Sequence, residues 1–121
     1  MNSGTSDARA AITAHLDAFN RHDASGLLAG LAPDARWRTG TSTVTGHTQL
    51  AELFDDGLWA MRPSLTVQRM VSDGRIIAAR LREDITIAGL RQGFAIAAFY
   101  EVSGGLINDV TIYREGSAEL G

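Results

Sequence analysis

The sequence predicts a single α+β domain, with three helices in the first half of the chain and an antiparallel sheet behind them. Apolar residues recur at helical spacing up to about residue 62, whereas residues 64–114 alternate between polar and apolar side chains as strands do. Glycine-containing pairs divide this second half into segments of strand length. A chain of 121 residues is large enough to bury a core, so we expect one domain over residues 1–121, with residues 1–5 loose.

The composition narrows the classes of partner and the compartment. The net charge is −3 and no basic stripe is present, which argues against nucleic acid as a partner. No apolar run approaches the roughly 20 residues of a membrane span, the N-terminus has no secretion signal, and cysteine is absent. We therefore expect a cytoplasmic protein without a membrane partner. Arginine supplies all 11 basic residues, which is typical of a GC-rich and hence bacterial genome.

The first helix is predicted to begin after Ser6, because serine caps helix N-termini. Its apolar face consists of Ala8, Ile12, Leu16 and Phe19. His15 lies on the same face, three residues after Ile12, which places an imidazole among core side chains.

Two further helices are predicted before the sheet. Asp23 is placed to cap the second helix, which Pro33-Asp34 is expected to end. The third helix begins near Thr48 and stops at Arg62-Pro63, because the residue before a proline avoids the helical conformation. Its apolar side consists of Leu50, Leu53, Phe54, Leu58 and Met61.

The strands are predicted from alternation and turn signals. Residues 35–39, ARWRT, place Ala35, Trp37 and Thr39 on one face, and residues 40–46 indicate a loop or a short hairpin. Four longer strands are expected near residues 64–72, 75–87, 92–102 and 106–114. Asp73-Gly74 is the strongest hairpin signal among their connections.

The strand GFAIAAFYEV, residues 93–102, is apolar on both faces. One face carries Phe94, Ile96, Ala98 and Tyr100, and the other carries Ala95, Ala97 and Phe99. Helices on one side of an antiparallel sheet leave its second face in water, so an apolar second face predicts a homodimer through the outer face of the sheet. The alternative is a monomer in which a central strand exposes a few small residues.

Four stretches occur in an order that resembles one protein superfamily. They are HLDAFNRHDASGLLAGLAPDARW, GHTQLAELF, SDGRIIAARLRED and GGLINDVTIYREGS, and together they span most of residues 7–118. The chain resembles nuclear-transport-factor-2-like proteins, and their SnoaL-like branch most of all. The resemblance implies a cone-shaped, curved sheet of mixed and antiparallel strands that wraps around the three helices and encloses a hydrophobic pocket. The superfamily includes ketosteroid isomerases, limonene epoxide hydrolases, polyketide cyclases and non-catalytic binding proteins, so it implies a pocket and no particular reaction.

Matching the family position by position shows mainly which catalytic groups are missing. In ketosteroid isomerases a tyrosine on the first helix stabilises an enolate, and the matching residue here is His15. The general-base aspartate and the protonated oxyanion-hole aspartate of those enzymes match Thr39 and Ala98. Without either carboxylic acid, that enolisation mechanism is not expected.

The match to limonene epoxide hydrolases retains one acid. Their strand arginine and aspartate match Leu81 and Glu83, and their last-strand aspartate matches Ile112. Their tyrosine and asparagine match Trp37 and Thr39. One carboxylate of the constellation therefore survives as a glutamate, and ordinary epoxide hydrolysis is not expected.

Glu83 and His15 are the candidate catalytic residues. The family geometry places Glu83 inside the cone, where its apolar neighbours would desolvate it and make it a general acid or base. A register slip of one residue would instead turn Arg82 inward. His15 projects from the first helix toward the same cavity. The alternatives are that Glu83 is a buried acid paired with His15 or Arg114, that the strand twists Glu83 toward solvent, and that His15 is a core residue.

The remaining candidates are substrate-binding residues. Arg114, on the last strand, is expected at the mouth of the pocket, able to pair with an anionic group, unless it is only a solvated or interface arginine. The wall is predicted to contain Trp37, Thr39, Phe54, Leu58, Phe94, Ile96, Ala98, Tyr100 and Ile112. The three histidines lack metal-ligand spacing and no glycine-rich phosphate loop follows a strand, so we expect neither a metal nor a cofactor.

These features together predict a small homodimeric enzyme that transfers protons on a hydrophobic, oxygenated small molecule. Isomerisation, cyclisation or dehydration suits a lone carboxylate, Glu83, helped by His15. Two alternatives stay open: a non-catalytic domain that binds an apolar small molecule, and a dimeric structural module whose cone is filled.

Overall fold

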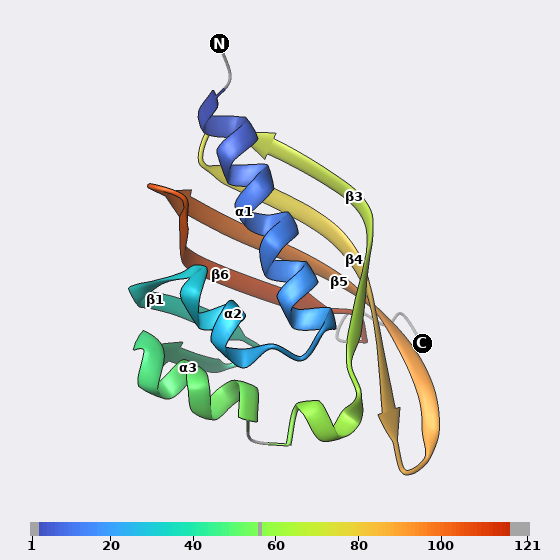
Figure 1. The fold of residues 1–121 in the computed structure, drawn as a ribbon. Helices are drawn as coiled ribbons and strands as arrows, with labels where there is room; N and C mark the ends of the chain where they lie inside the picture. The colour runs from blue at the N-terminus through green and yellow to red at the C-terminus, as the bar shows by residue number, and fades with distance from the viewer. Residues whose placement is uncertain (1–2, 56, 117–121) are drawn as a thin grey trace.

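The computed structural model describes residues 3–55 and 57–116 (Figure 1). The first half of the chain contains α1 (Ser3–Asn20), α2 (Ala24–Ala29), β1 (Leu31–Thr39), β2 (Ser42–Thr45), α3 (Gly46–Asp55) and the 3-10 turn η1 (Trp59–Met61). The second half consists of four strands, β3 (Ser64–Asp73), β4 (Ile76–Ile87), β5 (Leu90–Ser103) and β6 (Leu106–Arg114).

One six-stranded sheet has the order β2-β1-β6-β5-β4-β3. β1 and β6 are parallel, and the other neighbouring pairs are antiparallel, so the sheet is mixed. The sheet curves, does not close, and holds α1 along its inner face (Figure 1). This confirms the predicted α+β class and the curved sheet around helices. No helix in the described ranges is long and apolar enough to span a membrane.

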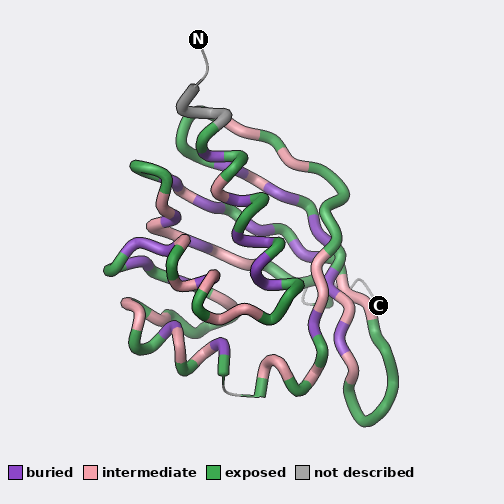
Figure 2. The backbone as a smooth tube through the Cα atoms, in the orientation of Figure 1, coloured by how far each residue is buried: buried purple, intermediate pink, exposed green. Residues whose placement is uncertain are grey.

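The core lies between the helices and the inner face of the sheet (Figure 2). Alternation along most of β4 and along the second half of β5 buries one side of each strand and leaves the other side half-buried or exposed. The largest fully buried side chains are Ile12, Leu27, Leu31, Leu50, Phe54, Ile77, Leu81, Ile85, Tyr100, Ile107 and Val110, with Pro63. Burying one such apolar side chain stabilises the fold by about 1.5–3 kcal/mol, so the sequence periodicity is enough to fix which face of each strand points inward.

The first two helices differ from the prediction at their ends. α1 begins at Ser3 and not after Ser6, so residues 3–5, which were expected to be loose, are helical. Residues 1–2 lie outside the described ranges. α2 ends at Ala29, because the backbone N–H of Gly30 closes the helix on the carbonyls of its last turn. The expected stop at Pro33-Asp34 is therefore wrong, and both residues lie in β1, where the register against β6 shifts between Leu31 and Arg36. Such an irregularity suits a proline, which has no N–H to donate to the ladder.

The third helix is shorter than predicted. α3 starts at Gly46 and ends at Asp55, and Gly57 then takes a left-handed φ of 80° that no helix contains. The chain turns back through η1, where Trp59 stacks on His22 at 4.9 Å between ring centroids and meets Phe19 edge-on at 5.4 Å. The break thus brings Leu58 and Trp59 over the end of the inner face.

Candidate functional site

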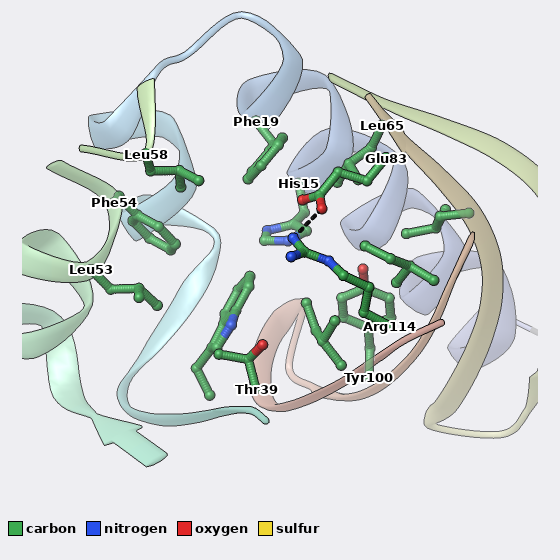
Figure 3. A pocket seen from close by; sticks show the side chains of 14 residues that line it. His15, Phe19, Thr39, Leu53, Phe54, Leu58, Leu65, Glu83, Tyr100 and Arg114 are labelled. Carbon is green, nitrogen blue, oxygen red and sulfur yellow. Dashed lines mark hydrogen bonds and ion pairs between the residues drawn. The ribbon is translucent and has the colours of Figure 1, made fainter. Parts of the chain in front are cut away.

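A cavity of about 140 Å³ lies between α1, α3 and the inner face of the sheet (Figure 3). Most of the side chains around it are apolar. Its wall consists of His15, Phe19, Trp37, Thr39, Leu53, Phe54, Leu58, Leu65, Leu81, Glu83, Ile96, Tyr100, Ile112 and Arg114.

Two residues predicted to line the pocket do not line it. Ala98 is fully buried, and its methyl group is too short to extend past the larger neighbours on the same face of β5. Phe94 lies near the rim, where the guanidinium of Arg114 stands over its ring at 5.0 Å from the centroid. Four further side chains line the cavity without having been predicted to do so: Phe19, Leu53, Leu65 and Leu81. Phe19, Leu53 and Leu81 already had inward parity, whereas Leu65 required the register that places β3 beside Glu83.

Glu83 points inward from the middle of β4. It pairs with Leu65 of β3 and Phe94 of β5, and only 7% of its surface is exposed. Its neighbour Arg82 is exposed on the outer face, where it binds Asp84 at 3.1 Å. The predicted strand register is therefore confirmed, and Glu83, the charged residue on this otherwise apolar strand face, belongs to the pocket.

The partner of Glu83 is Arg114, at the end of β6. Nη2 of Arg114 donates a hydrogen bond to Oε1 of Glu83 (Figure 3). The arginine side chain is 48% exposed, so it stands at the mouth with one side in water. Stacking on Phe94 adds a cation–π contact that holds the guanidinium in place. Of the open interpretations of Glu83, the pairing with Arg114 is the one that the geometry supports.

His15 faces the same cavity from α1 without contacting the carboxylate. It is 3% exposed, and its ring centroid lies 5.7 Å from those of Trp37 and Tyr100. Within the described ranges Nδ1 has no hydrogen-bond partner, and no hydrogen bond joins His15 to Glu83. Burial lowers the pKa of His15 from 6.5 to about 4, so the imidazole is neutral at neutral pH. Its hydrogen-bonding capacity is therefore not fully used.

Tyr100 provides a second neutral polar group in the wall. Burial raises the pKa of its phenol, so the hydroxyl keeps its proton and can donate a hydrogen bond at any ordinary pH. In Figure 3 that hydroxyl points into the pocket, and the hydroxyl of Thr39 lies farther along the wall. The cavity thus combines apolar walls with a few polar groups, as small-molecule sites do.

The other two histidines have structural contacts. Nε2 of His22 lies 3.0 Å from the carbonyl oxygen of Pro63, and Nε2 of His47 lies 2.9 Å from that of Leu31. Over the described ranges, no three His, Asp or Glu side chains gather in a way that could hold a metal ion.

The fold is shared with solved structures of proteins that are named for different activities. An epoxide hydrolase of M. tuberculosis resembling limonene epoxide hydrolases is 24% identical, with a TM-score of 0.83 over 92% of this chain and 84% of that one. A proposed ketosteroid isomerase of Kribbella flavida is 24% identical, with a TM-score of 0.80 over 97% of this chain and 84% of that one. A proposed polyketide cyclase of Xanthomonas campestris is also 24% identical, with a TM-score of 0.82 over 92% of both chains. At this level of identity the similarity shows the fold and not the reaction.

The sequence also matches a family directly. No curated protein matches the chain. Residues 12–110, however, match the SnoaL-like domain, and this range includes α1 from its middle, all of β3, β4 and β5, and the first half of β6. The chain belongs to the SnoaL-like domain family.

Proposed function

We propose that this chain binds a small, mostly apolar, oxygenated molecule and catalyses a proton transfer within it, without a cofactor. The observation that supports this most strongly is the position of Glu83, a nearly buried carboxylate in an apolar cavity. A carboxylate at the wall of a cavity can reach the hydrogens of a bound ligand, and general acid–base catalysis by one such group is worth about 10²–10⁴ in rate.

The roles of the polar groups follow from their protonation states. Glu83 takes a proton from a carbon next to the oxygen-bearing carbon of the ligand and returns it at a second carbon, so an isomerisation leaves the protein unchanged. His15 and Tyr100 are both neutral, and they donate hydrogen bonds to the ligand oxygen, where negative charge develops. Arg114 has to release the carboxylate before Glu83 accepts the proton.

A binding domain without catalysis is the second candidate. The ion pair favours it, because the carboxylate is already occupied by Arg114. In addition, Thr39, Ala98 and Ile112 stand at three positions where the resemblance to the enzymes of the superfamily would place catalytic acids. The open cavity does not favour a third reading, in which the cone is filled and the domain has a structural role alone.

Cyclohex-3-enone is a suitable test substrate because it has one ring and is converted to the conjugated cyclohex-2-enone by moving one proton. We expect the protein to accelerate this conversion, followed by ultraviolet absorbance, and Glu83→Gln to reduce the rate at least about 100-fold. Asp84→Asn is the matched control, since the Asp84 carboxylate pairs with Arg82 on the outer face. Equal rates for the protein and Glu83→Gln would contradict the catalytic role, and binding without conversion would support the binding domain.

We also propose a homodimer through the outer face of the sheet. Phe99 and Tyr113 meet edge-on there at 6.0 Å and are 45% and 60% exposed. Arg69 and Arg80 lie opposite each other on β3 and β4, and neither forms an ion pair within the described ranges. Glu101 and Asp109 also lie on this face, as paired neighbours on β5 and β6. Glu101 binds Arg75, and Asp109 binds Arg36 and Arg38, within the same chain. A two-fold axis across the face would bring the arginines of one copy over the carboxylates of the other.

A further inference from the structure

The polar groups of the pocket carry no net charge at neutral pH. His15 and Tyr100 are neutral because both are buried, and Thr39 does not ionise. The two charged residues, Glu83 and Arg114, neutralise each other in a direct ion pair. A ligand carboxylate entering this wall would meet the Glu83 carboxylate at close range and would find the one cation already engaged.

The cavity also limits the size of what it encloses. An apolar cavity of about 150 Å³ in another protein holds a benzene molecule. The volume of about 140 Å³ therefore suits one six-membered ring with one or two further non-hydrogen atoms. A second fused ring would exceed this volume.

Two polar side chains of the wall are placed to form hydrogen bonds with one oxygen atom of a ligand. His15 lines the cavity with Nδ1 unpartnered within the described ranges, although buried polar atoms normally find a hydrogen bond. Tyr100 directs its hydroxyl into the same space (Figure 3). A neutral imidazole and a phenol can each donate or accept, so a hydroxyl or a carbonyl suits them equally.

We infer that the pocket selects a neutral, single-ring molecule that carries one oxygen, and that it discriminates against the corresponding carboxylate. This rests on the proposed function, because it names the class of molecule that the proposed site takes. The charge of Glu83 is the determinant: it cancels the attraction that Arg114 would otherwise exert on an anion.

Toluene, benzyl alcohol and benzoate test this inference, since they share one ring and differ in the polar group. Binding is measured by titration calorimetry, with the fluorescence of Trp37 in the pocket wall as a second signal. We expect benzyl alcohol to bind several-fold more tightly than toluene and at least about tenfold more tightly than benzoate. 2-Naphthylmethanol, with a second ring, should bind at least about tenfold more weakly than benzyl alcohol.

Two variants move the preference in opposite directions. Glu83→Gln leaves Arg114 as an uncompensated cation, so benzoate affinity should rise at least about tenfold while that of benzyl alcohol changes less than about threefold. Arg114→Met leaves the carboxylate alone, so benzoate should bind more weakly still. Asp84→Asn removes a carboxylate from the outer face and should change neither affinity.

The outcomes separate this inference from the proposed function. Benzoate binding as tightly as benzyl alcohol, or an unchanged preference in both pocket variants, would overturn the charge argument while leaving a ligand site in place. Failure of all the single-ring compounds to bind would overturn the proposed function, and the inference with it.

Discussion

His15 makes the stability of this protein sensitive to mild acid. Its native pKa of about 4 lies below the unfolded value of 6.5 because the imidazole is buried. Between these pH values the unfolded chain binds a proton at His15 that the native protein does not bind. The free energy of unfolding therefore falls as the pH drops from 6.5 toward 4. Well above pH 6.5 both states are neutral, and the contribution of His15 no longer changes with pH.

The size of the effect follows from the two pKa values. At pH 5 the unfolded histidine is almost fully protonated and the native one is largely neutral. The difference corresponds to about 1.5 pK units, or about 2 kcal/mol of lost stability relative to pH 7. Below pH 4 the loss reaches its limit of about 3 kcal/mol.

The assay is urea unfolding at pH 7 and pH 5, at one protein concentration, for the protein and two variants. His15→Gln and His15→Phe do not titrate, whereas the other groups around the pocket, Glu83, Arg114 and Tyr100, are the same in all three proteins. We expect the unmodified protein to lose about 2 kcal/mol more than either variant between these pH values.

One result would refute this reasoning. If the variants lose as much stability as the unmodified protein, the acid sensitivity comes from groups that they share, and the imidazole of His15 accepts a proton in the native state. The ring would then have a hydrogen-bond acceptor close to it, which is at odds with an unpartnered Nδ1.

Three further predictions concern stability and assembly. In urea titrations, Arg114→Met should lower the free energy of unfolding by about 1–3 kcal/mol, and Glu83→Gln should lower it by less. Arg114→Met leaves a buried carboxylate unpaired, whereas the arginine left by Glu83→Gln reaches water, so the reverse order would contradict the geometry. Gly26→Ala should not raise the melting temperature, although alanine has a better helix propensity than glycine. The new Cβ would lie 2.4 Å from Oδ2 of Asp23 and would displace this N-cap, which is worth about 1 kcal/mol, so a higher melting temperature would refute the prediction. Phe99→Arg should shift the protein to a monomer in sedimentation experiments, and an unchanged mass would show that the outer face is not the interface.

The strands and their inward faces could be predicted because alternation is a local property of the sequence. The orientation of Glu83 follows from parity alone, and the structure confirms it. The ends of the helices could not be predicted so well. Gly30 and Gly57 end α2 and α3 earlier than the apolar pattern does, because the pattern records which face is buried and not where the backbone turns.

The composition of the pocket wall needed distances that no single sequence contains. Alternation along β5 predicts that Phe94 and Ala98 lie on its inner face, but it does not predict how far each side chain extends toward the pocket. The choice between His15 and Arg114 as the partner of Glu83 depends on β6 lying beside β5, with Ile96 opposite Arg114. The extent of the pocket wall and the partner of Glu83 both depend on how distant segments pair. The pattern of a single sequence predicts the periodicity of each segment but not this pairing.

The asymmetry of the Glu83–Arg114 pair decides how such a site can work. Arg114 is about half exposed and sits at the end of a strand, so it can exchange the carboxylate for water at a modest cost. Glu83 is held in the middle of β4, with only 7% of its surface exposed. Any movement that opens the pair therefore leaves a buried carboxylate without its cation beside an apolar cavity. In the proposed reaction, a ligand that fills the cavity would therefore have to displace the guanidinium of Arg114 before Glu83 could act on it.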